Sequence, residues 1–284
     1  MTDIAWYGFG NFGTPLANRF QNKGHRILPM EYDGHGREGI KQFIGQDHID
    51  EGLTLSECQV AAFCLPRTDD VEAIVKCHGS EMPPLLIDFS TGSPDAVLRM
   101  SKWAREHNRR YYDCPLSGSL ETIADGRVTA FVGAKENSDI ELQGILSVIS
   151  DKVFYFGFPS GGARAKLTNQ FLHISIMGLI SDALTYAKRQ ELDIDLLVKA
   201  WSCSSAGNKM LDRFGELILS GQHTCQFSLL MALKDLNAVR EQHSQSHIDS
   251  GYLAASIELY ETAMKSGMGA LNFSAVCLLE GVGY

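Results

Sequence analysis

Residues 3–25 read DIAWYGFGNFGTPLANRFQNKGH, and this stretch decides the fold. Its first five residues are a short, mostly apolar run that predicts a β-strand. A glycine-rich turn follows at residues 8–13. Residues 14–23 then place apolar side chains on one side of a predicted helix, and Gly24 ends that helix, as glycine commonly does just beyond a C-cap.

The glycine-rich turn has the spacing G-x-G-x-x-G between a predicted strand and a predicted helix. In such a turn the first glycine allows a tight bend, the second lets a pyrophosphate approach the backbone, and the third lets the helix pack closely on the strand. The pyrophosphate then lies at the helix N-terminus, where N–H groups and the helix dipole favour anions. The turn therefore predicts a dinucleotide site rather than an unliganded loop. Its expected cofactor-binding residues are Gly8, Phe9, Gly10, Asn11, Phe12 and Gly13.

An acidic residue at the end of the second strand is the next feature expected of such a site. Glu31 lies 18 residues after Gly13 and could accept hydrogen bonds from ribose hydroxyls. Its charge would repel a 2′-phosphate, and Tyr32 rather than arginine follows it, so the sequence favours NAD over NADP. His35 and Arg37 lie just beyond and could offset this preference. Alternatively, Glu31 is simply the solvent-facing end of a strand.

Further strands and helices alternate along the first 160 residues. Strands are expected at 26–31, 60–65, 85–89, 110–114, 129–132 and 153–156, with a helix at 94–107. This alternation predicts a parallel, doubly wound sheet of the Rossmann type.

Beyond Gly162 the pattern becomes entirely helical. Apolar residues recur at helical intervals, with breaks expected near 204–207, Gly221 and 267–269. We therefore expect a dinucleotide-binding domain over residues 1–160, followed by an all-α domain over residues 161–284 that a long interdomain helix enters.

Charge and composition exclude several classes of protein. The 284 residues carry a net charge of −9, so the chain would repel nucleic acids and anionic membranes. No apolar segment is long enough to span a bilayer, and the N-terminus lacks the features of a signal peptide. The seven cysteines form no C-x-x-C pair and the nine histidines have no metal-ligand spacing, so neither a disulfide framework nor a bound metal is expected. Free thiols are typical of the cytoplasm.

Five further short segments stand out beyond the glycine-rich turn. They are Leu65-Pro66, Asp88-Phe89-Ser90-Thr91, Asp113-Cys114-Pro115-Leu116-Ser117-Gly118, Gly162-Ala163-Arg164-Ala165-Lys166 and Lys234-Asp235-Leu236. With these segments in this order, the chain resembles the β-hydroxyacid dehydrogenase family over nearly its whole length. That family includes 3-hydroxyisobutyrate dehydrogenase, tartronate semialdehyde reductase and 6-phosphogluconate dehydrogenase.

The resemblance implies a reaction and a division of roles. The reaction would be reversible hydride transfer between a nicotinamide cofactor and a small 3-hydroxy acid or its semialdehyde. Lys166 would be catalytic. Leu65, Pro66, Thr91 and Lys234 would bind the cofactor, and Ser117, Gly118, Ser119, Asn169 and Gln170 would bind the substrate. The helical domain would form a homodimer or a higher homo-oligomer. Without the resemblance, Lys234 could be a surface ion-pair partner and Thr91 a helix cap, although Ser93 is the better cap candidate.

The proton step of this chemistry is assigned to Lys166. Burial near a positively charged nicotinamide would lower the pKa of a lysine, because desolvation and a like charge both disfavour the ammonium. Its pKa would thereby approach the operating pH, where general acid–base catalysis is most effective. Gln170, four residues later, shares a helix face with Lys166 and could hydrogen-bond the substrate.

The chain departs from the family pattern at three polar positions. Gln170 replaces the usual Asn, Ser119 replaces a second glycine, and Asn272 replaces a common Asp. The first two departures put the substrate in doubt more than the reaction. Two alternatives stay open: an imine reductase, although those enzymes generally lack the lysine, and a catalytically silent dinucleotide-binding scaffold.

Overall fold

The computed structural model describes residues 1–31, 40, 53–224, 227–247 and 249–281. These residues form two compact units, Met1–Lys166 and Leu167–Tyr284, and each unit is described by itself. The predicted domain limits at residues 160 and 161 fall close to this division, at the start of one long helix, and stay a prediction.

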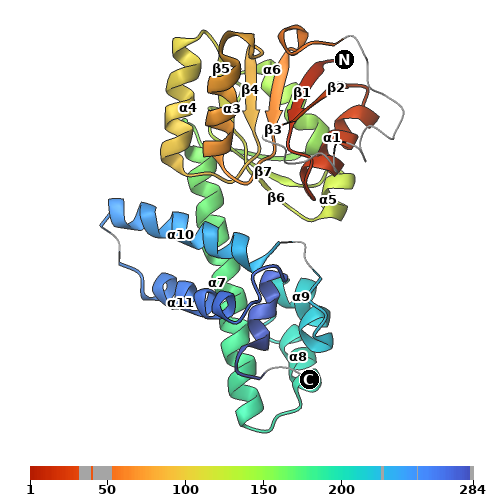
Figure 1. Cartoon of the computed structure of the whole chain (residues 1–284). Helices are drawn as coiled ribbons and strands as arrows, with labels where there is room; N and C mark the ends of the chain where they lie inside the picture. Colours follow the sequence, from red (N-terminus) through yellow and green to blue (C-terminus); the bar gives the residue numbers. More distant parts are fainter. Residues whose placement is uncertain (32–39, 41–52, 225–226, 248, 282–284) are drawn as a thin grey trace. The chain divides into compact units, whose positions relative to one another are not determined.

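The first unit is built on a parallel sheet with the strand order β2-β1-β3-β4-β5 (Figure 1). Its strands are β1 (Asp3–Tyr7), β2 (Arg26–Met30), β3 (Val60–Phe63), β4 (Leu85–Asp88) and β5 (Arg110–Asp113). The accompanying helices are α1 (Gly13–Asn22), α3 (Thr68–His78), α4 (Pro94–Glu106) and α6 (Ile140–Ile149), with short 3₁₀ turns at Leu55–Glu57 and Gly79–Glu81. The order reverses between β1 and β3, and ligands of open α/β sheets bind at the carboxyl ends of such strands.

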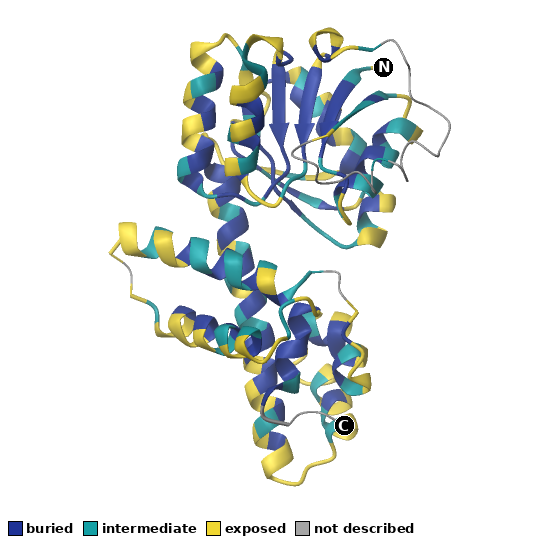
Figure 2. Ribbon diagram, viewed as in Figure 1, coloured by how far each residue is buried: buried dark blue, intermediate teal, exposed yellow. Residues whose placement is uncertain are grey.

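Both faces of this sheet are buried (Figure 2). Alternate side chains of a strand point to opposite faces, so Ile4 and Trp6 pack in the core that contains α1 and α6. Ala5 and Tyr7 pack in a second core, with α3 and α4. Helices therefore cover both faces, and the predicted doubly wound arrangement is confirmed.

A smaller sheet adds one feature that the sequence pattern did not predict. Its strands are β6 (Leu116–Ser117), β7 (Thr129–Val132) and β8 (Lys152–Tyr155), and the short helix α5 (Leu120–Ala124) follows β6. β7 and β8 pair in parallel, whereas β6 and β7 are antiparallel. A two-residue strand is too short to show an alternating pattern, which is why β6 was missed. The other predicted strands agree with the observed bounds to within two residues.

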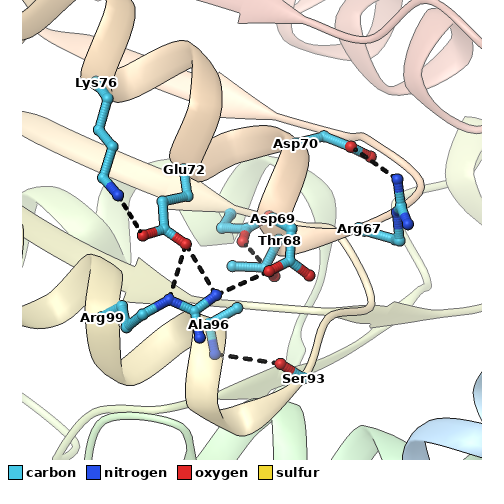
Figure 3. A network of polar contacts seen from close by, with 10 residues as sticks. Arg67, Thr68, Asp69, Asp70, Glu72, Lys76, Ser93, Ala96 and Arg99 are labelled. Carbon is cyan, nitrogen blue, oxygen red and sulfur yellow. Dashed lines mark hydrogen bonds and ion pairs between the residues drawn. The ribbon is translucent and has the colours of Figure 1, made fainter.

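Ion pairs connect α3 and α4 on the surface of the first unit (Figure 3). The Arg99 guanidinium lies 2.9 Å from the Glu72 carboxylate and 2.8 Å from that of Asp69, and Lys76 also pairs with Glu72. Exposed pairs of this kind contribute little individually, although a network contributes more. The Ser93 hydroxyl accepts a hydrogen bond from the backbone N–H of Ala96, which confirms Ser93 as the cap of α4.

The second unit is helical. The helices are α7 (Gly161–Arg189, which begins in the first unit), α8 (Ile194–Ser202), α9 (Lys209–Ser220), α10 (Leu229–Gln245), α11 (Gly251–Lys265) and a 3₁₀ segment at Phe273–Gly281. Breaks occur at the three places where they were predicted, near 204–207, at Gly221 and at 267–269, and Gly221 ends α9 in the left-handed conformation. The further break between α10 and α11 was not predicted. Tyr260 and Phe273 are fully buried in the core of this unit. Within the described residues, no helix combines the length and hydrophobicity that crossing a membrane requires.

Candidate active site

The turn after β1 has the geometry that its glycine spacing predicts. Gly8 has a φ of +99°, and a Cβ there would lie 2.2 Å from the carbonyl oxygen of Cys64. A Cβ on Gly13 would lie 1.9 Å from the carbonyl oxygen of Gly8, so α1 approaches the turn as closely as a glycine allows. A Cβ on Gly10, by contrast, would meet no described atom within 4 Å. The open space at Gly10 fits the approach of a pyrophosphate.

The carboxyl ends of β1, β3 and β4 are joined by hydrogen bonds. The Cys64 N–H donates to the Tyr7 carbonyl at 2.8 Å, and the Leu65 N–H donates to the Ser90 hydroxyl at 3.0 Å. Three predicted cofactor-binding segments therefore follow neighbouring strands, namely Gly8–Gly13, Leu65–Pro66 and Thr91.

Asp88 organises the end of β4. Its buried carboxylate accepts hydrogen bonds from the Thr68 hydroxyl (2.9 Å), the Tyr111 hydroxyl (2.8 Å) and the Ser90 N–H (2.8 Å). Burial raises the pKa of Asp88, although these hydrogen bonds act in the opposite direction. The carboxylate thereby holds the start of the loop that carries Thr91. Sequence reasoning recognised this segment but not the anchoring role of Asp88, since its hydroxyl donors lie 20 and 23 residues away.

The predicted adenosine-side residue Glu31 follows β2, the strand beside β1. It is exposed, which is compatible with contact to a ligand and equally with a solvent-facing strand end. Its role stays a prediction, and Tyr32, His35 and Arg37 lie outside the described residues.

The predicted substrate loop at residues 117–119 runs from β6 into α5. The Ser119 hydroxyl accepts a hydrogen bond from the Thr122 N–H, and the Thr122 hydroxyl accepts one from the Ser119 N–H at 2.6 Å. These reciprocal bonds cap α5. A Cβ on Gly118 would lie 2.4 Å from the Thr122 hydroxyl oxygen. Helix capping thus explains Ser119 locally, and the substrate contacts of Ser117, Gly118 and Ser119 stay a prediction.

Asp113 connects the end of β5 to the start of α7. Its carboxylate accepts hydrogen bonds from the Ser160 N–H (3.1 Å) and the Ala163 N–H (2.8 Å). A Cβ on Gly133 would lie 1.9 Å from this carboxylate, and one on Gly162 would lie 2.9 Å from it, so the pocket around Asp113 depends on glycine. Burial raises the pKa of Asp113 to about 7, although the two N–H donors act to lower it. Asp113 therefore caps α7 from a distant part of the chain.

Lys166 lies three residues after Ala163, in the first turns of α7. It is only 6% exposed, which is unusual because lysine is rarely buried without a partner or a function. The cap at the helix start therefore fixes the backbone that carries Lys166.

A second polar cluster lies in the helical unit. The Gln170 amide donates to one oxygen of Asp235 at 2.7 Å, and the Lys234 ammonium lies 3.1 Å from the other oxygen. The Asn169 amide contacts the Gln170 amide oxygen at 3.4 Å. Sequence reasoning placed Gln170, Asn169 and Lys234 at the site but did not identify Asp235 as the common partner of Gln170 and Lys234. Because α7 is continuous, Gln170 and Lys166 share one of its faces.

Among the described residues, no three His, Cys, Asp or Glu side chains are grouped in a way that could hold a metal ion. The fold and the glycine turn instead define a Rossmann-type dinucleotide-binding protein with a helical second unit. Residues 3–157 match the NAD-binding domain of 6-phosphogluconate dehydrogenase. Residues 160–279 match the family described as the NAD-binding domain of NADP-dependent 3-hydroxyisobutyrate dehydrogenase. The chain belongs to the β-hydroxyacid dehydrogenase family.

Individual relatives cover nearly the whole chain. The 3-sulfolactaldehyde reductase of Escherichia coli is 24% identical, over 97% of this chain and 95% of the relative. The structure of Mycobacterium tuberculosis 3-hydroxyisobutyrate dehydrogenase with L-serine has a TM-score of 0.83, with 20% identity over 98% of each chain. An imine reductase from Bacillus cereus has a lower TM-score of 0.61, with 17% identity over 97% of this chain and 98% of the reductase. The two structural likenesses confirm the fold.

The contrast between Gly10 and Gly13 gives a first prediction. Gly10→Ala should fold with a Tm close to that of the wild type, because its methyl group enters open space, yet weaken NAD or NADP binding about tenfold or more. Gly13→Ala should lower the free energy of unfolding by about 1–3 kcal/mol, because its methyl group overlaps the Gly8 carbonyl. Thermal unfolding and calorimetric cofactor titration measure both effects. Wild-type affinity in Gly10→Ala would contradict a pyrophosphate site at this turn.

The raised pKa of Asp113 gives a second prediction. Between about pH 4 and 7 the folded carboxyl keeps a proton that the unfolded one releases, so its contribution to stability falls as pH rises through this window. Asp113→Asn removes this titration and replaces an acceptor with a donor that faces N–H groups. The wild-type advantage in unfolding free energy should therefore shrink between pH 5 and 7, by at most about 1.4 kcal/mol per pH unit.

Asp139→Asn is the matched control, since Asp139 caps α6 through the N–H groups of Glu141 and Leu142. Burial acts to raise the pKa of Asp139, but the Leu142 N–H and the charge of Arg110 lower it overall. Its stabilisation is lost as pH falls through the lowered value, so the wild-type advantage over this variant should grow as pH rises from below that value to above the ordinary aspartate value of 3.8. The same trend in both variants would show that the Asp113 assignment is wrong.

Proposed function

We propose that this protein catalyses reversible hydride transfer between a nicotinamide cofactor and a small 3-hydroxy acid or its semialdehyde. The observation that carries the proposal is the buried lysine at the capped start of α7. It stands in a chain whose family is established and whose relatives include a 3-sulfolactaldehyde reductase.

The chain's own residues fit the cofactor at the turn after β1, where a Cβ at Gly10 would stand in the space that a pyrophosphate needs. Bound nicotinamide supplies or accepts the hydride. Leu65, Pro66 and Thr91, at the ends of neighbouring strands, would hold its reactive side. Glu31 would accept hydrogen bonds from ribose hydroxyls and repel a 2′-phosphate, which favours NAD over NADP.

The proton step falls to Lys166. During oxidation its amine would accept the proton of the substrate hydroxyl, and during reduction its ammonium would donate a proton to the carbonyl oxygen. Ser117 and the N–H of Gly118 would hold the substrate carboxylate, since neutral donors suit an anionic oxygen. Asn169 and Gln170 would complete the substrate side, and a cytoplasmic location fits the free thiols.

We also propose that the protein is a homodimer. Leu172, Leu179 and Tyr186 recur at seven-residue intervals along α7 and are 63%, 55% and 67% exposed. Apolar residues with this spacing form a narrow seam of the kind that packs against another helix, and exposed apolar groups in line mark interaction surfaces. A second copy of this chain would cover the seam.

The catalytic proposal predicts the behaviour of Lys166→Ala. Its kcat should fall about 10²-fold or more, because a positioned acid–base group contributes on that scale, while the dissociation constant of NAD stays within about threefold. A screen at 340 nm with both cofactors, against small 3-hydroxy acids, their semialdehydes and cyclic imines, measures this. Turnover that survives the substitution would refute the lysine's role. Turnover of the cyclic imines alone would favour an imine reductase. Cofactor binding without turnover of any compound would favour a dinucleotide-binding scaffold that has no catalytic activity.

The dimer proposal predicts that Leu179→Glu shifts the protein towards monomer. A carboxylate in an apolar seam must be desolvated without a partner, which costs more than an interface of this kind gains. Sedimentation velocity measures the shift, and Lys188→Ala, on another part of the α7 surface, is the control. A wild-type monomer, or a dimer that tolerates Leu179→Glu, would contradict the proposal.

A further inference from the structure

The small sheet of the first unit has a buried face and an outer face. Leu116, Ala130 and Val132 are buried in the core that contains α1 and α6. Successive residues of a strand point to opposite faces. Their neighbours Ser117 and Phe131 therefore lie on the outer face.

Three phenylalanines gather on this outer face. Phe131 is paired in register with Phe154 on β8. Phe156 follows two residues later, and its N–H still donates to the Val132 carbonyl at 2.8 Å. The rings of Phe131 and Phe156 are stacked, with their centroids 6.1 Å apart. Phe154 is 54% exposed and Phe156 is 40% exposed. We call these three side chains the aromatic face, and exposed apolar groups that lie together in this way mark a binding surface.

The aromatic face is continuous with the predicted substrate loop. Ser117 is paired in register with Thr129, which lies two residues before Phe131 on β7. Residues in this diagonal relation across antiparallel strands are about 7–8 Å apart. The Ser117 side chain and the Phe131 ring therefore lie within the length of one small molecule.

The proposed acid–base residue adjoins the same face. A Cβ on Gly161 would lie 2.8 Å from the Cβ of Phe156, and one on Gly162 would lie 2.4 Å from the carbonyl oxygen of Phe131. The first turn of α7 is therefore packed against these two phenylalanines. Lys166 lies one turn beyond Gly162 on the same side of the helix, and it belongs to the same compact unit as the small sheet.

We propose that Phe131 and Phe154 determine substrate specificity, because their rings bind an apolar substituent of the substrate, above all an aromatic one. This inference rests on the proposed function. If Ser117 holds the carboxylate and Lys166 exchanges the proton of the hydroxyl, a substituent on the carbon between these two groups lies next to the phenylalanine rings. The substrate class is therefore a 3-hydroxy acid, or its semialdehyde, that carries an aryl or branched alkyl group at C2.

The size of the aromatic face favours a small molecule over a protein as its occupant. A stable protein interface buries roughly 800 Å² on each partner, and three partly exposed rings offer far less than this area. A single benzyl group matches them better, since aromatic rings attract one another beyond the gain from buried area.

Calorimetric titration with two acids in the presence of saturating NAD tests the inference. The probes are 3-hydroxypropionate and 2-benzyl-3-hydroxypropionate, which differ only in the benzyl group. The wild type should bind the benzyl acid more tightly by about tenfold or more. Phe131→Leu and Phe154→Ala should each reduce this preference about threefold or more, because each removes one aromatic contact.

Leu98→Ala is the matched control. Leu98 is also an exposed apolar residue, at 43%, but it lies on α4, whose buried residues pack in the other core. This variant should keep the wild-type preference for the benzyl acid. Because Phe154 is more than half exposed, its truncation should leave the fold intact, and the test does not depend on the folding of the Phe131 variant.

Two outcomes would overturn the inference. The first is a wild type that binds both acids equally well. The second is a lower Tm in the phenylalanine variants with an unchanged preference, which would mean that the rings serve only cross-strand packing.

Absorbance at 340 nm separates this inference from the proposed function. If the wild type prefers the benzyl acid and the phenylalanine variants lose that preference, but neither acid reduces NAD, the proposed function fails and the aromatic face keeps its assignment. If both acids are oxidised with the same kcat/KM by the wild type and by both phenylalanine variants, the inference fails alone.

Discussion

The capping of α7 by Asp113 is the interaction on which the candidate site depends. The first N–H groups of any helix lack partners within the helix, and the positive end of the helix dipole favours a negative charge. Asp113 supplies acceptors for both Ser160 and Ala163, from the end of a strand nearly 50 residues earlier in the chain. One buried carboxylate therefore holds the start of α7, and with it the backbone of Lys166.

Asp113 is paired in register with Asp88 on the neighbouring strand β4. Each of the two buried carboxylates lies at the end of its strand and accepts hydrogen bonds from another segment at this edge of the sheet. Asp88 orders the loop that carries Ser90, and Asp113 orders the helix that carries Lys166. The negative charge of Asp88 adds to the raised pKa of Asp113, since neighbouring like charges disfavour ionisation. The desolvation of both groups is thus the cost of arranging the loop that carries Thr91 and the helix that carries Lys166 at one edge of the sheet.

The sequence predicted those features of the fold that depend on the spacing of residues within a short segment. The alternating strands and helices, the glycine turn and the Ser93 cap each depend on residues that are close together in the sequence. The structure confirms all three. The hydrogen bonds of Asp113 to Ser160 and Ala163, of Asp88 to Thr68 and Tyr111, and of Gln170 to Asp235 were not predictable in this way. In each of them the two residues lie at least 20 positions apart along the chain. Burial was equally hidden, since a lysine on a helix is usually exposed and only packing shows Lys166 to be buried.

The three departures from the family pattern have a common physical explanation. Ser119 caps α5, Gln170 donates to Asp235, and the Asn272 amide oxygen accepts hydrogen bonds from the N–H and hydroxyl of Ser274. An aspartate at position 272 could accept the same two bonds but would bring a charge into a fully buried place, whereas asparagine leaves its amide nitrogen buried without a hydrogen-bond partner. Each departure is therefore a residue with partners inside its own unit. The three departures are therefore local replacements, each accommodated by hydrogen bonds that its own unit supplies.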